Sequence, residues 1–309
     1  MRVFVTGASG WIGSAVVPEL LAAGHQVVGL ARSDASSAAL AAAGAEVQAG
    51  SLDDLDRLGE AAAASDGVIH LAFRHDIAFA GRYQDATDAD RLAIETFGEA
   101  LADSHRPLVI ASGVLGLAPG RVATEQDGHG PEPGAPPGGA QTRRGNAELA
   151  LSLASRGVRS SVVRLAPTVH GDGDTGFVAT LVDIARRTGV SGHIGDGSNR
   201  WPAVHRLDAA HLFRLALESS PAGSTLHAVA DEGVPIRDIA AVIARHLDLP
   251  VAAISPDDAA AHFTWMAPFL VSGGPVSSAL TRELVGWQPT HPGLIEDLDQ
   301  GHYFRNPTA

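Results

Sequence analysis

Two polar side chains with useful chemistry lie at the ends of apolar, strand-like runs. Ser112 ends PLVIAS, and His170 ends APTVH. A serine hydroxyl in such a place can hydrogen-bond a substrate oxygen, and an imidazole can donate a proton near neutral pH. Each has a structural alternative, because serine hydroxyls often bond nearby backbone groups and a histidine that ends a strand is often part of the packing. His75 and Tyr83 are further candidates for a proton donor.

The basic and sulfur-containing residues narrow the chemistry. All 22 basic side chains are Arg, and the chain has no Cys. Disulfides, thiolate ligands and a cysteine nucleophile are therefore excluded, while a guanidinium can hold anions or hydroxyls but donates no proton near neutrality. The 14 His form no HxxEH, HExxH or HxH grouping, and the acidic stretch GDGD at 171–174 lacks matching ligands. We expect no metal site.

Three glycines follow the first apolar run at a spacing suited to a diphosphate. In RVFVTGASGWIG, Gly7, Gly10 and Gly13 come directly after a β-branched run and open a helical pattern. Gly7 permits a tight turn, Gly10 lets the backbone approach a pyrophosphate, and Gly13 lets the helix pack close to the strand. A tight turn without a ligand is the alternative, but the strand–turn–helix context favours dinucleotide binding.

The end of the second apolar run selects the nucleotide. In GLARSDAS, Arg32 and Ser33 stand where an Asp or Glu would bind the ribose 2′-hydroxyl of NAD. An Arg suits the 2′-phosphate of NADP, with which it pairs bidentately. Asp34 is a complication, and a solvated surface role for Arg32 is the alternative. We expect NADP(H) as the cofactor.

These residues must be positioned by strands and helices that alternate along the first half of the chain. The strands are apolar along their whole length, as in a parallel sheet with helices on both faces. We predict an α/β fold with a doubly wound parallel (Rossmann) sheet. Residues 1–170 form the dinucleotide-binding domain, and residues 171–309 complete the sheet and form a smaller substrate lobe. The predicted strands are 2–6, 25–31, 45–50, 67–73, 106–113 and 160–166, and the predicted helices include 14–24, 90–104 and 143–155.

Charge and hydropathy limit the partners. A formal net charge of −13 argues against nucleic acid, whose phosphates need clustered positive charge. No run approaches the roughly 18 apolar residues of a membrane-spanning helix, and Met1 leads directly into a strand, so neither a signal peptide nor a membrane anchor is expected. We expect a cytoplasmic protein whose partner is a small-molecule substrate.

Together these motifs resemble the extended short-chain dehydrogenase/reductase superfamily, specifically its atypical, epimerase-like members. The resemblance covers nearly the whole chain. It implies an adenine-contacting segment at 50–55, a strand passing the cofactor ribose at 70–73, and a segment cradling the nicotinamide carboxamide at 164–171. The motifs, in order, are TGASGWIG (6–13), GSLDDL (50–55), HLAF (70–73), IASGVLG (110–116), RLAPTVHG (164–171), VHRLDAA (204–210) and LVGWQP (284–289).

The resemblance also implies the site residues. The active-site helix of the family reads YxxxKxxxE, and Glu148 sets its register, so Ala140 and Arg144 stand where Tyr and Lys would be expected. Arg144 could still hold the ribose hydroxyls. We expect Ser112, Arg144 and His170 to be catalytic. The expected cofactor-binding residues are Gly7, Ser9, Gly10, Trp11, Ile12, Gly13, Arg32, Ser33, Ser51, Leu52, Leu71, Ala72, Phe73, Arg144, Pro167, Thr168 and Val169.

Two further segments bear on the substrate. The Gly- and Pro-rich stretch 128–139 reads as a surface loop, either a flap over the substrate or an insertion without a role. The aromatic residues Trp201, Phe263, Trp265 and Phe269 are either core or an apolar wall of the substrate site. The second alternative favours a bulky, apolar ligand over a sugar nucleotide.

We therefore predict an NADPH-dependent oxidoreductase that reduces a C=O or C=N bond of a small to medium, fairly apolar substrate. A non-catalytic NADP(H)-binding sensor is the alternative that the missing Tyr favours. A sugar-nucleotide epimerase or dehydratase fits the altered site less well. The resemblance implies a homodimer through helix 90–104 and the helix after Arg144, although both could bury their apolar stripes within their own fold.

Overall fold

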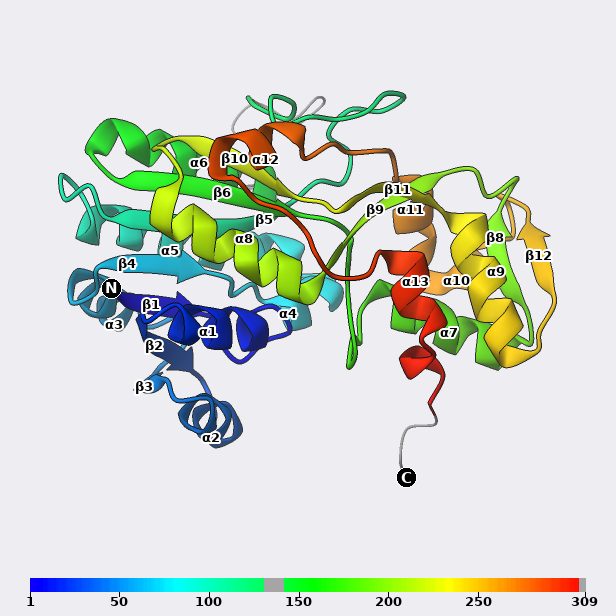
Figure 1. Ribbon diagram of the computed structural model, residues 1–309, viewed down its shortest axis with the longest axis horizontal. Helices are drawn as coiled ribbons and strands as arrows, with labels where there is room; N and C mark the ends of the chain where they lie inside the picture. The colour runs from blue at the N-terminus through cyan, green and yellow to red at the C-terminus, as the bar shows by residue number, and fades with distance from the viewer. Residues whose placement is uncertain (131–141, 306–309) are drawn as a thin grey trace.

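A seven-stranded, wholly parallel sheet forms the larger of two lobes (Figure 1). The computed structural model describes residues 1–130 and 142–305. The strand order is β10-β6-β5-β4-β1-β2-β3, which reverses direction between β1 and β4 and confirms the predicted doubly wound α/β fold. The strands are β1 Arg2–Thr6, β2 Gln26–Ala31, β3 Glu46–Ala49, β4 Gly67–His70, β5 Pro107–Gly113, β6 Arg159–Leu165 and β10 Ser224–Ala228.

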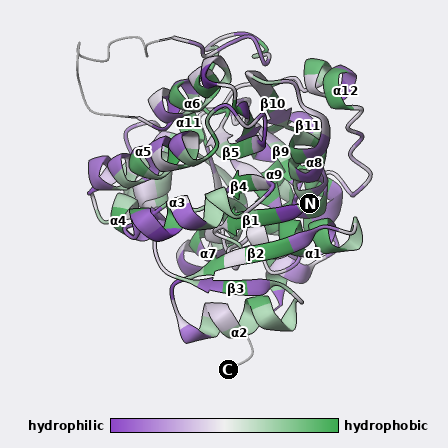
Figure 2. Ribbon diagram, turned by 90° about the vertical axis from the view of Figure 1, so that its left-hand side faces the viewer, coloured by the Kyte–Doolittle hydropathy of each residue, from purple (hydrophilic) through white to green (hydrophobic). Residues whose placement is uncertain are grey.

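Helices cover both faces of this sheet, with α1 and α8 on one side and α3, α5 and α6 on the other (Figure 2). The predicted helix at 90–104 corresponds to α5, which begins earlier, at Tyr83, and ends at Ala100. The helices of the larger lobe are α1 Gly13–Ala22, α2 Asp34–Ala42, α3 Leu55–Ala63, α4 His75–Phe79, α5 Tyr83–Ala100, α6 Arg143–Ser152 with the 3-10 turn η1 Leu153–Arg156, α8 Arg206–Ser219 and α12 Ala279–Val285.

The double cover explains why the strands are apolar throughout. Val3 and Val5 of β1 pack into a core with α1 and α8, whereas Phe4 between them packs into a second core with α5 and α6. Successive side chains of a strand point to opposite faces, and here both faces are buried. None of the helices in the described ranges is long and apolar enough to cross a bilayer.

The smaller lobe contains two short sheets and its own core. One sheet has the order β11-β9-β7 and the other pairs β12 with β8. Trp201, Phe263 and Met266 are buried at its centre. Its elements are β7 Thr168–His170, α7 Phe177–Thr188, β8 Ser191–Ile194, β9 Arg200–His205, β11 Asp231–Pro235, α9 Ile236–Leu247, β12 Val251–Ile254, α10 Ala259–Phe263, η2 Thr264–Met266, α11 Ala267–Val271, α13 Leu294–Asp299 and η3 His302–Phe304.

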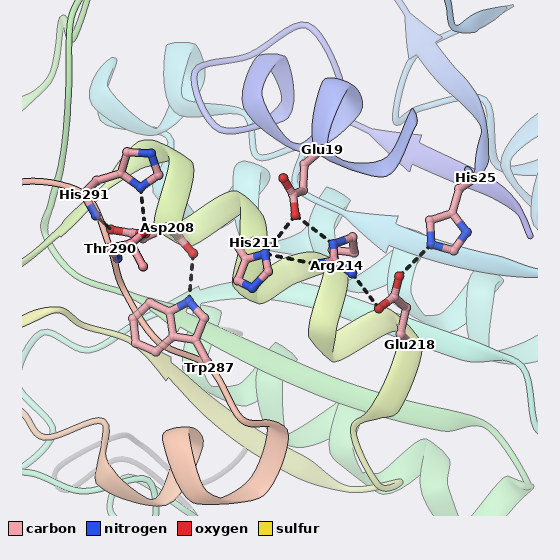
Figure 3. A network of polar contacts seen from close by, with 9 residues as sticks. All are labelled: Glu19, His25, Asp208, His211, Arg214, Glu218, Trp287, Thr290 and His291. Carbon is pink, nitrogen blue, oxygen red and sulfur yellow. Dashed lines mark hydrogen bonds and ion pairs between the residues drawn. The ribbon is translucent and has the colours of Figure 1, made fainter. Parts of the chain in front are cut away.

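Helix α8 ties the C-terminal segment to the larger lobe (Figure 3). The Asp208 carboxylate accepts the backbone N–H groups of Thr290 and His291 at 2.9 and 3.1 Å, and the Trp287 indole donates to the Asp208 carbonyl at 3.0 Å. VHRLDAA and LVGWQP, two motifs of the resemblance, therefore bind each other. Asp208 and Trp287 are buried away from the residues that line the cleft described below.

Farther along α8, charged side chains bind this helix to α1. Glu19 of α1 accepts from Arg214 at 2.7 Å and contacts His211 at 2.9 Å, and Arg214 also bonds Glu218. Figure 3 shows these groups in a row along α8. Helix α8 is thus bound both to α1, which follows the first strand, and to the C-terminal segment around Trp287.

Candidate active site at the carboxyl edge of the sheet

A cleft of about 1380 Å³ opens where the parallel strands of the larger lobe end and the smaller lobe begins. Strands β1 and β4 point toward the smaller lobe (Figure 1), and the reversal of strand order between them places the cleft at the switch point where such sheets bind ligands. Phe177 of α7 and Phe269 of α11 contribute a wall from the smaller lobe. The cleft is therefore shared by the two lobes.

The glycine-rich turn lies at the floor of the cleft. Gly7 has a φ of +66°, and a Cβ added there would lie 2.7 Å from the backbone nitrogen of Ala72. A Cβ on Gly13 would lie 2.1 Å from the carbonyl oxygen of Gly7, so this position must be glycine for α1 to start so close to β1. Gly7 and Gly10 line the cleft, whereas Gly13 lies behind the turn.

Trp11 links this turn to the segment predicted to cradle a nicotinamide. Its indole N–H donates to the Val169 carbonyl at 2.8 Å, and the guanidinium of Arg206 lies 4.2 Å from its ring centroid. Two segments far apart in the sequence, 7–12 and 167–169, are thereby held side by side along the cleft.

Arg32 and Ser33 differ in their placement. Arg32 lines the cleft with 69% of its side chain exposed, and its guanidinium lies 3.5 Å from Asp76. Ser33 does not line the cleft, because it caps α2 and its hydroxyl accepts the backbone N–H of Ser36. Of the predicted pair, Arg32 is the one that lines the cleft.

A buried chain of hydrogen bonds supports the cleft from below. The Thr6 hydroxyl contacts His70 Nδ1 at 2.6 Å, His70 Nε2 lies 3.2 Å from Asp90, and Asn146 donates to Asp90 at 2.6 Å. The backbone N–H of Ala72 also donates to Thr6, at 3.3 Å. This chain connects β1, β4, α5 and α6.

The carboxylate at the centre of this chain is ionised. Burial alone would raise the pKa of Asp90, but the hydrogen bond and charge of His70, the charge of Arg143 and the Asn146 hydrogen bond outweigh burial and hold the pKa below its usual value. A charged carboxylate accepts these bonds more strongly than a neutral one, so the network fixes α6 against the sheet.

Ser112 lies in the cleft with its hydroxyl available. It is 6% exposed, and its hydroxyl has no hydrogen-bond partner within residues 1–130 and 142–305. In the parallel pairing of β5 and β6 its register partner is Arg164, so the two side chains are neighbours on the same face of the sheet.

Arg143, the residue before the predicted Arg144, contacts the strand that carries Ser112. An Arg143 Nη atom donates to the carbonyl of Ala111 at 3.1 Å, and the guanidinium carbon lies 4.3 Å from the Phe73 ring centroid. Arg144 also lines the cleft, but its Nε donates to the Gly128 carbonyl at 2.8 Å.

His170 is placed outside the cleft. It is fully buried in the second lobe, where its Nδ1 lies 2.9 Å from Asp297, and its ring packs edge-on against His205. It does not line the cleft, so we assign it no proton transfer. His205 is also part of this packing, and burial together with the nearby His170 and His291 lowers the pKa of His205 to about 4.

Other side chains that can carry a proton do line the cleft. They include His75, Tyr83 and Asp174. Burial and the charge of Arg143 lower the pKa of His75, whereas burial raises the pKa of Asp174 despite its hydrogen bonds to Gly176 and Tyr303. The sequence alone indicated only a polar turn at Asp174. In the described residues no three His, Asp or Glu side chains are placed to hold a metal ion.

Most of the predicted cofactor residues line this one cleft. Gly13, Ser33 and His170 are the predicted site residues that do not, and Ala140 lies outside the described residues, as does nearly all of the stretch 128–139. The predicted residues that line it are Gly7, Ser9, Gly10, Trp11, Ile12, Arg32, Ser51, Leu52, Leu71, Ala72, Phe73, Ser112, Arg144, Pro167, Thr168 and Val169.

The cleft fits a dinucleotide. The glycine-rich turn leaves its backbone open to a diphosphate, and two buried polar atoms on its walls, Arg143 Nε and Thr168 Oγ1, have no hydrogen-bond partner among the described residues. Buried polar groups are normally satisfied, so a bound ligand with hydroxyl, amide or anionic groups would complete these walls.

Comparison with known proteins identifies the family of this chain. The family model described as NAD dependent epimerase/dehydratase family matches residues 3–229. An uncharacterized protein of Schizosaccharomyces pombe is 48% identical over 98% of this chain and 100% of its own length. A 4-hydroxy-2-methyl-3-oxo-4-farnesyl-3,4-dihydroquinoline-1-oxide ketoreductase of Stigmatella aurantiaca is 30% identical over 76% of this chain and 70% of its own.

A solved structure shares the fold. The dTDP-glucose 4,6-dehydratase DesIV of Streptomyces venezuelae, with NAD and TYD bound, superposes with a TM-score of 0.75 over 98% of this chain and 97% of its own, at 20% identity. At this identity the likeness concerns the fold alone.

Proposed function

The chain belongs to the NAD-dependent epimerase/dehydratase family, and from that premise we propose that it is an NADPH-dependent reductase of a C=O or C=N bond in a small to medium, fairly apolar substrate. The observation that carries this proposal is the convergence of the glycine-rich turn, Arg32, Ser112 and the segment 167–169 on one cleft. The relative from Stigmatella aurantiaca, a ketoreductase by name, supports the reaction type.

The bound cofactor would supply the hydride, which adds to the carbonyl carbon while a proton goes to the oxygen. Ser112 is positioned to donate a hydrogen bond to that oxygen, because its hydroxyl is uncommitted and faces the cleft. Arg143 adds a fixed positive charge beside it, which stabilises negative charge on the oxygen in the transition state. The proton comes from one of the cleft-lining donors His75, Tyr83 or Asp174, or from solvent.

The preference for NADPH is proposed from Arg32. Its guanidinium is mostly exposed at the end of β2 and loses only a weak contact with Asp76 if it turns to a 2′-phosphate. The apolar substrate is proposed from the wall opposite Ser112, where Phe177 and Phe269 pack 5.0 Å apart, ring centroid to ring centroid.

The test is NADPH oxidation against a panel of aromatic and aliphatic ketones, aldehydes and imines, with NADPH binding measured separately by fluorescence. We expect turnover of at least one class and tighter binding of NADPH than of NADH. Intact NADPH binding without turnover of any member would instead support the non-catalytic sensor.

A further inference from the structure

The inner end of the cleft carries three guanidinium groups. Arg143 and Arg144 reach it from the first turn of α6, and Arg164 reaches it from β6 beside Ser112. No carboxylate of the described residues lies within 4.0 Å of any of the three. Their hydrogen bonds go to uncharged backbone carbonyls, those of Ala111, Gly128 and Asp127.

The outer end of the same cleft is different. There Arg32 faces Asp76, and Arg74 contacts both carboxylate oxygens of Asp53 at 3.0 and 3.1 Å. The chain as a whole has a formal charge of −13. Within this cleft, the arginines that have no carboxylate within 4.0 Å thus lie at the end that holds Ser112. At longer range the charge of Arg143 acts on Asp90, and Glu148, Asp127 and Glu125 act on Arg164. Asp174, the acidic side chain that the smaller lobe contributes to the cleft lining, has its pKa raised by burial.

Of the three arginines, Arg143 is the one prepared to bind a ligand. One Nη is held by the carbonyl of Ala111, the residue before Ser112, and the guanidinium rests on the Phe73 ring. Its Nε is buried and has no hydrogen-bond partner in the described parts of the chain. A buried donor without an acceptor is unfavourable, and a fixed guanidinium pairs best with a planar anion through two parallel hydrogen bonds.

We propose that the substrate of this cleft carries a carboxylate, or a group of similar charge and shape, and that Arg143 binds it. The inference rests on the proposed function only in placing a substrate beside Ser112. Arg144 and Arg164 also donate to backbone carbonyls, and both add positive potential at this end of the cleft. Together with the wall of Phe177 and Phe269, the charge defines the substrate class as an apolar, aromatic oxo acid.

The proposal can be tested by measuring ligand binding to the protein loaded with NADP⁺, because this complex cannot reduce the ligand. Benzoylformate and its uncharged methyl ester are titrated into the NADP⁺-loaded protein by calorimetry. We expect the acid to bind at least about tenfold more tightly than the ester, because a charge-assisted pair replaces a neutral contact. Arg143→Gln should abolish this preference and Arg143→Lys should keep part of it. Arg156→Gln removes the same charge from the exposed turn η1 and should leave the preference unchanged.

The outcomes separate the proposal from its alternatives. Equal binding of acid and ester to the wild type, or a preference that survives in Arg143→Gln, overturns the carboxylate assignment. If Arg143→Gln weakens NADP⁺ binding as much as acid binding, Arg143 holds the cofactor ribose and the assignment is also overturned. Unfolding midpoints and NADP⁺ titration show whether each variant is folded.

Turnover of benzoylformate and of its methyl ester is then measured with NADPH. An Arg143-dependent preference for the acid without any reduction would leave the anion site standing and reject the reductase. Reduction of the ester but not of the acid would support the reductase and reject the anion site.

Discussion

The hydroxyl of Ser112 and the guanidinium of Arg143 both line the cleft, and Arg143 is bound to the carbonyl of Ala111, the residue before Ser112. In the described residues the Ser112 hydroxyl has no hydrogen-bond partner, and no carboxylate lies within 4.0 Å of the Arg143 guanidinium, whose charge acts on Asp90 only at longer range. This leaves both free to respond to charge that develops on a ligand, which is the arrangement that favours a transition state over a ground state.

For Ser112→Ala we expect kcat to fall by about 10² while NADPH affinity hardly changes, because one donor to the developing oxyanion is lost and no cofactor contact is. Steady-state kinetics with NADPH and fluorescence titration give the two numbers. Ser155→Ala, at an exposed hydroxyl in η1, is the matched control. A turnover equal to the wild type would show that the hydroxyl takes no part.

For Arg32→Ala we expect the ratio of NADPH to NADH affinity to fall by about tenfold or more, since a charge-assisted bond to a phosphate is worth about 1.5–3 kcal/mol. Competition titrations of the two nucleotides measure it. Arg156→Ala serves as the control for lost charge. An unchanged ratio would mean that Arg32 remains a solvated surface residue and that the 2′-phosphate is bound elsewhere.

The sequence could predict that the glycine-rich turn and Ser112 lie at the carboxyl edge of the sheet, but not that Arg143 contacts the strand of Ser112. The register of the resemblance, counted back from Glu148, reached Arg144. Which of two adjacent arginines faces β5 depends on where α6 begins, and that is set by Thr142, whose hydroxyl caps the helix by accepting the Gly145 N–H. Such a cap is visible only once the helix is placed against the sheet.

At the scale of elements, the buried chain from Thr6 to Asn146 holds four elements together beneath the cleft. For Asp90→Ala we expect a loss of about 3–5 kcal/mol in the free energy of unfolding, because His70 and Asn146 lose their shared acceptor while they stay buried. Urea unfolding measures it.

Asp85→Ala on the same helix is the control for this loss. Its exposed contact with Arg82, 3.6 Å long, should be worth less than about 1 kcal/mol. If both variants lost the same free energy, the buried network would contribute no more than a surface pair.

His205, at the junction of β9 and α8, leads us to expect that the free energy of unfolding depends on pH. An unfolded His titrates near 6.5, whereas His205 in the fold has its pKa lowered to about 4. Between these values the unfolded state binds a proton that the folded state refuses, so stability present above pH 6.5 is lost as the pH falls toward 4. Urea unfolding from pH 4 to 7 should show this slope.

His205→Asn should flatten that slope while keeping an acceptor for the Leu207 N–H that His205 caps. His105→Asn, at an exposed position with a φ of +55° that Asn tolerates, should leave the slope as it is. An unchanged slope in His205→Asn would assign the pH dependence to other groups.

One strand of the large sheet, β10, was not predicted, and it leads into β11 rather than into a helix. The other six strands were predictable, because strand-like runs and helical patterns alternate in that part of the sequence. The strands of the smaller lobe were not. β7, β9 and β11 pair across long separations, and their short lengths give no clear alternation. In the same way, Asp174 lines the cleft and accepts a hydrogen bond from Tyr303 of η3, a residue far away in the sequence. Such contacts depend on the completed packing of the second lobe.

At the scale of the whole molecule, the homodimer stays a proposal. The apolar stripe of α5, with Ala93, Ile94 and Phe97, is buried within the chain's own core, while Leu92 on the same helix is 40% exposed. We expect light scattering to give the mass of a dimer and Leu92→Glu to shift it toward the monomer, because a buried charge opposes association. A monomeric wild type would exclude the proposed pairing.

The chain passes repeatedly between the two lobes, at 166–167, 205–206, 229–230, 272–278 and 286–293. A protease that cuts one of these connections leaves the other connections covalently intact. The hydrogen bonds from Trp287 and Thr290 to Asp208 still link the C-terminal segment to α8. The fragments of a nicked molecule should therefore stay associated and still take up a nucleotide. By the same reasoning, neither lobe can be excised as one continuous gene fragment, so exchanging substrate lobes between relatives would require transplanting several separate stretches at once.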